Sequence, residues 1–296
     1  MADAGSTLPR RQLGKLLLEW RTRAGLTQVK AAELLEIGQS SVQRLEKGEN
    51  SRLRSGTIRD ACELYGVPKE LAEGMIGLAK QANVKNWWNQ YSDVIAKSFD
   101  MYVGLESAAT TLESYQPDLI PGLLQTVDYD RALVQLIWPD AEPEEWERRV
   151  ALKRQRQHLV TRRNQPLTVD CVIGEAALRR IAGNYLIMGA AMRHLADMST
   201  LPNVTIRILP FEAGYPDGLS MPPFVILGFG GAATGAPAAP PVIFLEGGVG
   251  EMYVEDEDDV KLYRSRWNNL KAAALSPEDS RRRLRDLGRE YEQRER

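Results

Sequence analysis

Four polar residues lie close together in the sequence, at spacings that place them on one side of a helix: Gln39, Ser40, Gln43 and Arg44. Val42 and Leu45 are three residues apart, so they form the apolar side of the same helix. Side chains of glutamine, serine and arginine can hydrogen-bond to base edges in the major groove of DNA. The pattern therefore predicts an exposed helix face that is suited to reading bases.

The residues just before this face predict the helix that must support it. Thr27 is placed to cap a helix that ends at Leu35. The segment Glu36-Ile37-Gly38 then breaks the helix, and Gly38 can serve as the N-cap of the next one, Gln39 to about Lys47. The two short helices and the turn between them form the expected DNA-reading unit.

Three further helices are expected around this pair: Leu13 to Ala24, Ser55 or Thr57 to Tyr65, and Lys69 to about Ala82. The first and the second of these are followed by Gly25 and Gly66, which suit the position after a helix end, and Pro68 suits a helix start. We therefore predict that residues 1–82 form an all-α, five-helix DNA-binding domain, with the small polar residues Met1–Pro9 disordered.

Two groups of residues in this domain resemble the helix-turn-helix family of XRE, Cro and phage repressors. These are Leu26-Thr27-Gln28 and Arg44-Leu45-Glu46-Lys47-Gly48, and the resemblance covers roughly Leu13 to Val67. The chain departs from the family at Glu36, where glycine is common, and at Gly38, where serine or threonine is common.

The resemblance to the repressor family implies roles for single residues. Gln39, Ser40 and Arg44 are expected to reach base edges, and Gln28 is expected to hold a phosphate. An alternative for Arg44 is that it braces Glu46 inside the domain.

Composition limits the class of protein. The chain has 296 residues and a net charge of −2, but Arg10 to Tyr65 holds 11 lysines and arginines against 7 acids, so positive charge gathers where DNA binding is expected. It has only two cysteines, no apolar stretch long enough to span a membrane, and no apolar signal segment at its start. These features predict a reduced, cytoplasmic protein.

Residues 83–100 form an aromatic-rich connector. It holds Trp87, Trp88 and Tyr91, which a flexible linker would not need. We expect these rings to pack on the second domain or on a second subunit, or alternatively to complete the core of the first domain.

Residues 101–296 predict an α+β domain with a mixed sheet. The expected strands are Leu167–Ile173, Val204–Leu209, Phe224–Phe229, Val242–Leu245 and Glu251–Val254. The expected helices are Glu144–Arg163, Glu175–Ala182, Leu186–Met198, Val260–Ala274 and Pro277 to about Glu292. The helices between the first two strands predict that these strands pair in parallel.

This second domain resembles that of the actinobacterial antitoxin-like regulators, which carry a C-terminal domain of unknown function behind an XRE-type head. The matching residues are Glu106, Ile120-Pro-Gly-Leu-Leu-Gln-Thr126, Tyr129 and the helix near Arg148–Arg163. The resemblance implies a transcription regulator, often linked to development, secondary metabolism or a small partner protein encoded nearby. It implies no known ligand.

The sequence lacks the residue sets that catalysis or metal binding needs. His158 and His194 lie in predicted helices, and neither Cys62 nor Cys171 has a nearby histidine. Glu246 and Glu251 could do acid–base work but also suit a solvated turn, and the acids Glu255–Asp259 suit a helix N-terminus better than a metal or a basic partner. We expect no catalytic residue, no metal and no cofactor.

These observations predict a dimeric transcription regulator that binds double-stranded DNA at an inverted-repeat operator. Its second domain, residues 101–296, is expected to take part in dimerisation and to sense a ligand or dock a partner, through residues that the sequence does not identify. The segment Gly218–Phe224 and the glycine-, alanine- and proline-rich stretch Gly228–Pro241, expected to be mobile, lie beside strand ends where pockets form. The alternatives are an antitoxin-like component that holds a small partner protein and an enzyme with a fused DNA-binding head.

Overall fold

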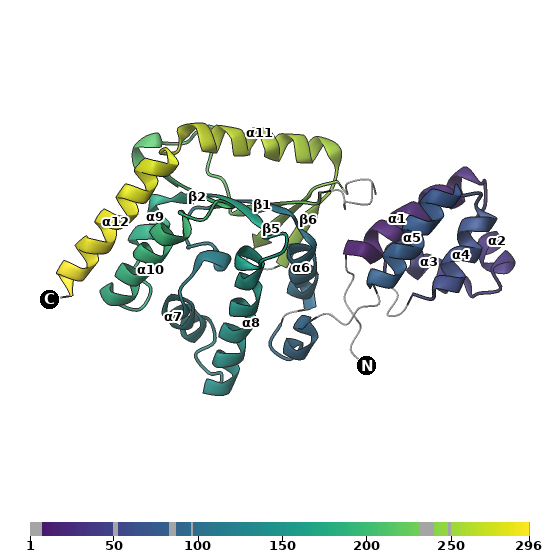
Figure 1. The fold of residues 1–296 in the computed structure, drawn as a ribbon, viewed down its shortest axis with the longest axis horizontal. Coiled ribbons are helices and arrows are strands. Elements are labelled where there is room, and N and C mark those ends of the chain that lie inside the picture. The colour runs from purple at the N-terminus through teal and green to yellow at the C-terminus, as the bar shows by residue number, and fades with distance from the viewer. Residues whose placement is uncertain are drawn as a thin grey trace. The chain divides into compact units, whose positions relative to one another are not determined.

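A computed structural model describes residues 8–49, 53–82, 87–95, 97–230, 240–247 and 250–295. The chain forms two compact units (Figure 1). Of the described residues, those between 8 and 92 and between 97 and 108 form the N-terminal unit, and most of the others form the C-terminal unit. Residues 1–7 and 231–239 lie outside the described residues, and with them most of the segments expected to be disordered or mobile.

The N-terminal unit begins with five helices, as predicted. They are α1 (Leu8–Arg23), α2 (Gln28–Leu34), α3 (Gln39–Lys47), α4 (Ser55–Leu64) and α5 (Lys69–Ala82). Residues from all five pack into one apolar core, which includes Leu13, Ala31, Leu45, Ile58 and Met75. The all-α class predicted for this part of the chain is confirmed.

The helix ends of the N-terminal unit follow from single residues. The Thr27 side chain accepts a hydrogen bond from the Lys30 amide, which confirms it as the cap of α2. Gly48 ends α3 with a left-handed φ of 69°. The expected caps of α4 are wrong, because Ser55 is its first helical residue and Arg54 holds the N-cap position without a side-chain bond.

The turn between α2 and α3 contains the departure from the repressor pattern at Glu36. This residue has a φ of 54°, in the left-handed region where glycine is favoured. A side chain there costs about 1–2 kcal/mol relative to the right-handed conformation. The turn therefore keeps its geometry without glycine and carries that strain.

The connector forms two elements: a 3-10 helix, η1 (Trp87–Tyr91), and the helix α6 (Lys97–Ala108). Trp88 is buried, and its ring is close enough to Gly104 of α6 that a Cβ at this glycine would lie 3.3 Å from it. Trp87 meets Trp88 edge to face, with ring centroids 5.6 Å apart. Trp88 is thus buried within its own chain, which leaves it no surface for a second subunit.

The C-terminal unit is built on a six-stranded mixed sheet in the order β3-β2-β1-β4-β5-β6. The strands are β1 (Thr111–Gln116), β2 (Thr168–Gly174), β3 (Val204–Leu209), β4 (Phe224–Gly228), β5 (Val242–Gly247) and β6 (Gly250–Val254). β2 pairs in parallel with β1 and β3, and the remaining pairs are antiparallel. The mixed sheet and the parallel pairing of β2 with β3 are confirmed, whereas β1, in the middle of the sheet, was not predicted.

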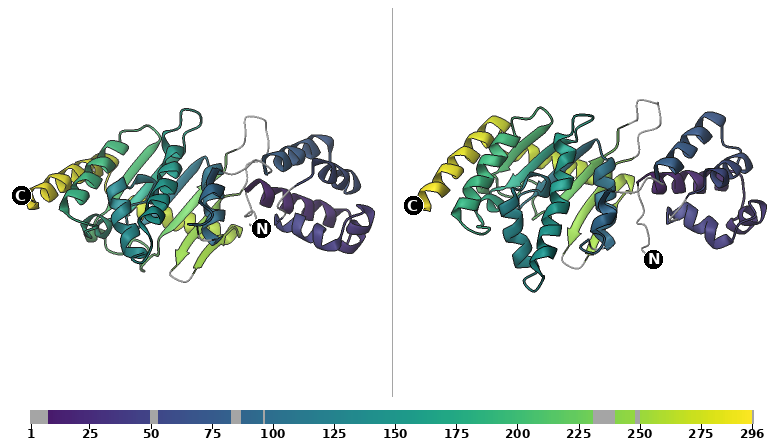
Figure 2. Two further views of the ribbon diagram at one scale, coloured as in Figure 1. Left: turned by 90° about the horizontal axis from the view of Figure 1, so that it is seen from below. Right: turned by 60° about the horizontal axis from the view of Figure 1, so that its bottom comes forward.

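Helices cover both faces of this sheet. They are α7 (Val127–Ile137), α8 (Pro143–Thr161), α9 (Glu175–Arg179), α10 (Tyr185–Met198), α11 (Glu257–Ala273) and α12 (Pro277–Arg294). Figures 1 and 2 show α11 on one face and α7, α8 and α10 on the other. The core under α11 contains Tyr115, Leu209, Met221, Trp267 and Leu270.

The two C-terminal helices begin at side-chain caps. Asp256 accepts bonds from the amides of Asp258 and Asp259, so part of the acidic run 255–259 caps α11. Ser276 caps α12 by accepting a bond from the Asp279 amide, and Pro277 follows at the first helical position, as predicted. The acidic run therefore has a structural role at the start of α11.

Gly14 sets how closely α1 approaches α3. A Cβ at this position would lie 2.4 Å from the backbone oxygen of Glu46 and 2.8 Å from that of Leu45. We predict that Gly14→Ala lowers the free energy of unfolding of the N-terminal unit by about 1–3 kcal/mol, because backbone must move to admit the methyl group. Urea unfolding of the full chain, followed by circular dichroism, measures the change.

Gly74 in α5 provides the matched control, since a Cβ there would meet nothing within 4 Å. Gly74→Ala should stabilise the unit by about 0.5–1 kcal/mol, because alanine loses less backbone entropy than glycine in a helix. Equal effects of the two substitutions would contradict the steric account of Gly14.

Candidate nucleic-acid interface

The four polar residues predicted to read bases lie together on α3. Gln39, Ser40, Gln43 and Arg44 are all exposed. Val42 and Leu45, on the opposite side of the helix, are 2% and 8% exposed. The helix spans the predicted residues, from the N-cap Gly38 to the left-handed Gly48. The structure thus brings the candidate residues onto one exposed face, while their contacts with DNA stay a prediction.

A buried ion pair fixes the orientation of α3. The Glu46 carboxylate accepts bonds from Arg21 of α1, with Nε to Oε1 at 2.5 Å and Nη2 to Oε2 at 3.1 Å. The two side chains are only 10% and 4% exposed. Arg21 also donates from Nη1 to the Leu26 carbonyl oxygen at 2.5 Å, so one guanidinium links α1, the start of the helix-turn-helix and α3. Such two-point pairing fixes geometry as well as distance.

The same carboxylate holds Gln28. Its Nε2 donates to Glu46 Oε2 at 2.7 Å, and the side chain is half-buried at the start of α2. An amide nitrogen has two hydrogens, so this bond leaves a second donor. The expected phosphate contact of Gln28 stays a prediction that is compatible with this geometry.

The group that braces Glu46 is Arg21 and not Arg44. Arg44 is exposed and, within the described part of the chain, makes no ion pair. The alternative in which Arg44 braces Glu46 is therefore wrong. The sequence contains both partners of the real pair, but they are 25 residues apart and no local spacing connects them.

The surroundings of Arg21 and Tyr65 keep each of these two side chains in one protonation state. The Glu46 side chain raises the pKa of Arg21 by hydrogen bonding, against the opposing effect of burial. Burial, followed by the Glu46 charge, raises the pKa of Tyr65 to about 12. Arg21 therefore stays charged and Tyr65 stays neutral at physiological pH.

Exposed basic side chains lie on α1, α2 and α3. Lys30 pairs with Glu33 at 2.9 Å and Arg23 pairs with Glu19 at 2.8 Å, both on the surface. Lys47 is exposed at the end of α3 and, like Arg44, makes no ion pair with a described residue. Unpaired cations beside a helix face that carries hydrogen-bond donors suit the phosphate backbone of DNA.

The motif Ile120–Thr126 of the C-terminal unit forms a closed hydrogen-bond network. Gln125 is buried and donates to the Ile120 carbonyl oxygen at 2.7 Å. Lys153 of α8 donates to Gln125 Oε1 at 2.8 Å and pairs with Asp130 of α7, while Gln157 donates to the Gln125 carbonyl oxygen at 2.8 Å. Burial lowers the pKa of Lys153. These bonds join the motif to α7 and α8 and leave it a structural role.

Of the residues considered for catalysis, Glu246 and Glu251 lie together, and the two cysteines lie in other elements. Glu246 and Glu251 face each other across β5 and β6, and Glu251 accepts a bond from its own strand's Tyr253 at 3.0 Å. Cys62 and Cys171 are buried, and burial raises the pKa of Cys62 to about 11. Among the residues that the structure describes, no three histidine, cysteine or acidic side chains are placed to hold a metal ion.

Comparison with protein families divides the chain in a similar way. A model for a helix-turn-helix domain matches residues 12–74, which cover α1 to α4 and the start of α5. A model described as a domain of unknown function, DUF5753, matches residues 99–286, more than half of the chain. The chain belongs to the DUF5753 family. It is thus a helix-turn-helix protein with a C-terminal DUF5753 domain, and no match is found among curated proteins or solved structures.

The start of the DUF5753 match bears on the expected domain boundary at residue 101. The match begins at residue 99 and includes most of α6, whereas the contacts of α6 place it in the N-terminal unit. The boundaries at 82, 100 and 101 stay predictions.

In the described residues, no helix is long and apolar enough to cross a membrane.

The Arg21–Glu46 pair makes a testable prediction about α3. Arg21→Met leaves Glu46 charged and buried without its partner, so the free energy that protects α3 from opening should fall by about 3–5 kcal/mol. Hydrogen exchange of the α3 amides in the full chain measures this change.

The pair of Arg23 and Glu19, on the same helix α1, is the matched control. Both side chains are more than half exposed, so Arg23→Met should change α3 protection by less than about 1 kcal/mol. If the α3 amides are equally protected from hydrogen exchange in the two methionine variants, the buried pair does not position the helix.

Proposed function

We propose that the chain is a sequence-specific DNA-binding transcription regulator that acts as a dimer. Its C-terminal DUF5753 domain senses a ligand or docks a partner. The observation that carries the proposal is the exposed face of Gln39, Ser40, Gln43 and Arg44 on a helix that a buried ion pair holds in place. The match to a helix-turn-helix domain supports it.

The chemistry of the α3 face supports direct reading of bases. Arginine donates two bonds to the major-groove edge of guanine, and glutamine pairs with adenine through its amide. Rigid support matters here, since a loosely held helix pays an ordering cost on binding. Arg21 and Glu46 remove that cost by fixing α3 before DNA is met.

Arg44 provides the first test. Operators selected from random duplexes should bind Arg44→Ala about 1–3 kcal/mol more weakly than the parent, with preference relaxed at one base position. The charge-matched control is Lys80→Ala, which removes an exposed cation from α5. It should leave the base preference unchanged. Equal losses in the two variants, with preference intact in both, would remove Arg44 from the reading face.

Gln28 is expected to act differently from Arg44. A phosphate contact carries no sequence information, so its loss should weaken all duplexes evenly. Because Gln28 also bonds to Glu46, its substitution disturbs the support of α3 as well. For this reason Arg44 is the cleaner probe of base reading.

Dimerisation is the second test. One recognition helix reads too few base pairs for genomic specificity, so two heads should bind half-sites about 10 base pairs apart in an inverted repeat. Sedimentation of the full chain at micromolar concentration should give a dimer, and two chains should bind each operator duplex. A monomer that binds the operator one to one would contradict this part of the proposal.

A second candidate function is that of an antitoxin-like component which holds a small partner protein. The observation in its favour is a run of exposed apolar residues at the end of α7, Leu136, Ile137 and Trp138, which are 73%, 60% and 40% exposed. Exposed apolar patches of this kind mark protein interaction sites. The two functions differ in what the purified chain does alone, since only the regulator needs to recognise an operator without a partner.

The proposal contains no catalytic step and no cofactor. The observation that most favours an enzyme is the pair of Glu246 and Glu251, which lie opposite each other on β5 and β6. Turnover by the purified chain, or a metal that stays bound to it, would favour the alternative of an enzyme with a DNA-binding head.

A further inference from the structure

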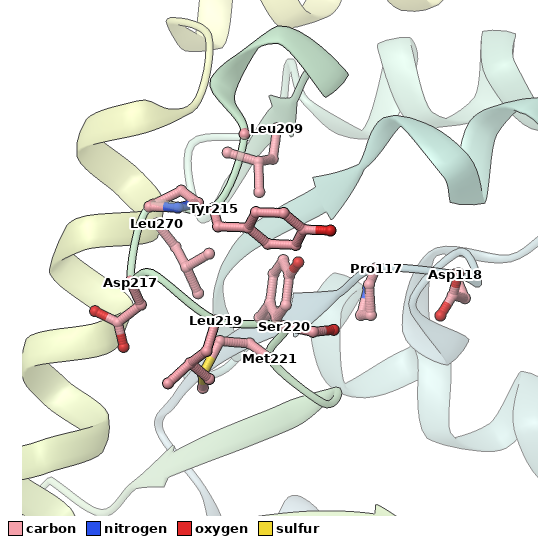
Figure 3. Close-up of a pocket in the computed structure, with 12 residues that line it drawn as sticks. Pro117, Asp118, Leu209, Tyr215, Asp217, Leu219, Ser220, Met221 and Leu270 are labelled. Atoms are coloured by element: carbon pink, nitrogen blue, oxygen red, sulfur yellow. The ribbon is translucent and has the colours of Figure 1, made fainter.

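The C-terminal unit contains a pocket at the carboxyl ends of β1 and β3 (Figure 3). Its inner wall is formed by Tyr115, Leu209, Met221 and Leu270, which belong to the core between the sheet and α11. Its outer wall is the loop that follows β3, which contributes Tyr215 and Leu219 among others. The pocket is therefore an extension of an apolar core that opens to solvent.

The sheet topology places this pocket at a distinctive point. β1 pairs in parallel with β2 on one side and antiparallel with β4 on the other, so the strand pairing changes from parallel to antiparallel at β1. In open α/β sheets, ligands bind outside the carboxyl ends of the strands where the strand order changes. A shared fold does not by itself show that a ligand binds, so the chemistry of the lining residues must indicate which ligand the pocket accepts.

A glycine allows the wall to close over the strand ends. A Cβ at Gly174, the last residue of β2, would lie 2.6 Å from the backbone oxygen of Pro117. The segment after β1 therefore passes directly over the end of β2, and Pro117 and Asp118 form one side of the pocket. Figure 3 shows Tyr215 reaching from the opposite loop toward that side.

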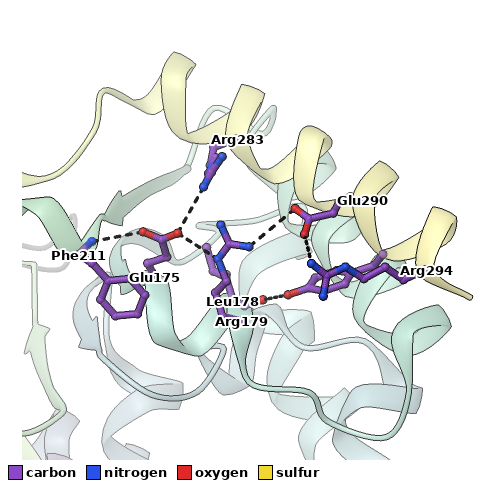
Figure 4. Close-up of polar contacts among 8 residues, drawn as sticks. Glu175, Leu178, Arg179, Phe211, Arg283, Glu290 and Arg294 are labelled. Carbon is purple, nitrogen blue, oxygen red and sulfur yellow. Dashed lines mark hydrogen bonds and ion pairs between the residues drawn. The ribbon is translucent and has the colours of Figure 1, made fainter.

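The outer loop is anchored at two points, one at its start and one near its middle. At its start, the Phe211 amide donates to Glu175 at 3.2 Å, and Glu175 also accepts bonds from Arg179 and Arg283 (Figure 4). Burial opposes ionisation of Glu175, but the bonds from these groups lower its pKa overall. Further along, Asp217 pairs with Arg266 of α11 at 3.2 Å. The walls are thus formed before any ligand binds.

The exposed residues of the loop are unusually apolar for a surface. Tyr215 is 72% exposed and Leu219 is 48% exposed, although both line the pocket. Leu119, which follows Asp118, is 47% exposed. Large apolar side chains gathered around a cavity mouth, with a few polar groups, are typical of small-molecule sites.

The polar groups of the lining favour one charge type in the ligand. Asp118 and Asp217 contribute carboxylates, Tyr115, Tyr215 and Ser220 contribute hydroxyl groups, and the described lining includes no lysine, arginine or histidine. Arg180 pairs with Asp118 at 2.7 Å and Arg266 pairs with Asp217 at 3.2 Å, so both carboxylate charges are partly offset. The two carboxylates only accept hydrogen bonds and keep part of their negative charge, so they favour a ligand that donates a hydrogen bond and disfavour an anion.

The volume limits the size of the ligand. The pocket measures about 130 Å³. A cavity of about 150 Å³ in an engineered lysozyme holds one benzene molecule, so this pocket has room for one ring or a short chain. Larger ligands would have to extend past Tyr215 into solvent.

We propose that this pocket binds a small ring compound that bears a hydrogen-bond donor and is uncharged or positively charged. The apolar wall takes the ring, and the acceptors near Asp118 and Tyr215 take the donor. The role of this compound as the ligand of a sensing domain rests on the proposed regulator function. Its binding to the pocket can be measured without DNA.

Three probes that share one ring test the proposal: benzylamine, benzyl alcohol and benzoate. Calorimetric titration of the full chain should show saturable one-site binding of the amine and the alcohol. Benzoate should bind at least about tenfold more weakly, because the acceptors repel its carboxylate. Absence of saturable binding for all three, or tightest binding of benzoate, would overturn the proposal.

Matched variants locate the site. Tyr215→Ala removes an exposed wall and should weaken binding of the amine and the alcohol by about fivefold or more. Phe211→Ala removes an aromatic ring of the same loop that is 63% exposed but does not line the pocket, and it should change affinity less than about twofold. Equal losses in both variants would place the binding elsewhere on the loop and overturn the assignment.

Asp118→Asn tests the effect of the carboxylate charge, because asparagine has nearly the same size and shape as aspartate. It removes one carboxylate from the rim, so it should narrow the gap between benzylamine and benzoate without changing the affinity of benzyl alcohol. An unchanged gap would overturn the electrostatic part of the proposal. Operator titration without any probe tests the regulator function separately, so failure of the pocket and failure of the function are distinguishable.

Discussion

The position of α3 depends on one buried carboxylate. Glu46 accepts bonds from Arg21 of α1 and from Gln28 of α2 while its own backbone belongs to α3, so one side chain joins three helices. A buried charge is costly unless it is paired and hydrogen-bonded. The pairing therefore serves specificity of arrangement more than stability: α1, α2 and α3 have few other orientations in which the carboxylate keeps its partners.

The C-terminal unit depends in a similar way on β1. This strand lies in the middle of the sheet and connects a parallel half to an antiparallel half. Its Tyr115 pairs with Phe224 of β4 in register, and the two rings lie 5.9 Å apart in the core beneath α11. Glu113 of β1 pairs with Arg264 of α11. The strand thus sets the sheet topology and also the inner wall of the pocket.

Local patterns in the sequence were sufficient where local forces determine the structure. α3 and α5 have the predicted bounds, because glycine, proline and the spacing of apolar residues specify helix ends within a few residues. β3 likewise has its predicted bounds, since it alternates apolar and polar residues. The four exposed residues of α3 followed from the same periodicity.

Long-range contacts explain what the sequence did not reveal. β1 reads Thr-Leu-Glu-Ser-Tyr-Gln, and it buries Ser114 while Glu113 is satisfied by Arg264, 151 residues away. A strand stabilised by such partners lacks the run of β-branched residues that marks other strands. The pairing of Arg21 with Glu46 was not predicted for the same reason, since only the fold brings the two side chains together. Of the pocket, the sequence predicted only the segment Gly218–Phe224, because the other walls come from β1, the earlier part of the loop after β3 and α11.

The anchored loop limits how a ligand in the pocket could influence DNA reading. Phe211 and Asp217 are already held by Glu175 and Arg266, so a ligand meets a formed wall and gains little by ordering it. A ligand shifts an equilibrium only as far as its affinities for two states differ. Control of DNA binding therefore requires a second state in which this loop, or α11 beside it, is displaced. Arg266 and Glu175 are the groups whose bonds such a state must break, because they tie the loop to α11 and to the α9–α12 network. The free energy of those bonds then sets how the two states are populated without ligand, and the difference in the ligand's affinity for the two states sets the coupling to the operator.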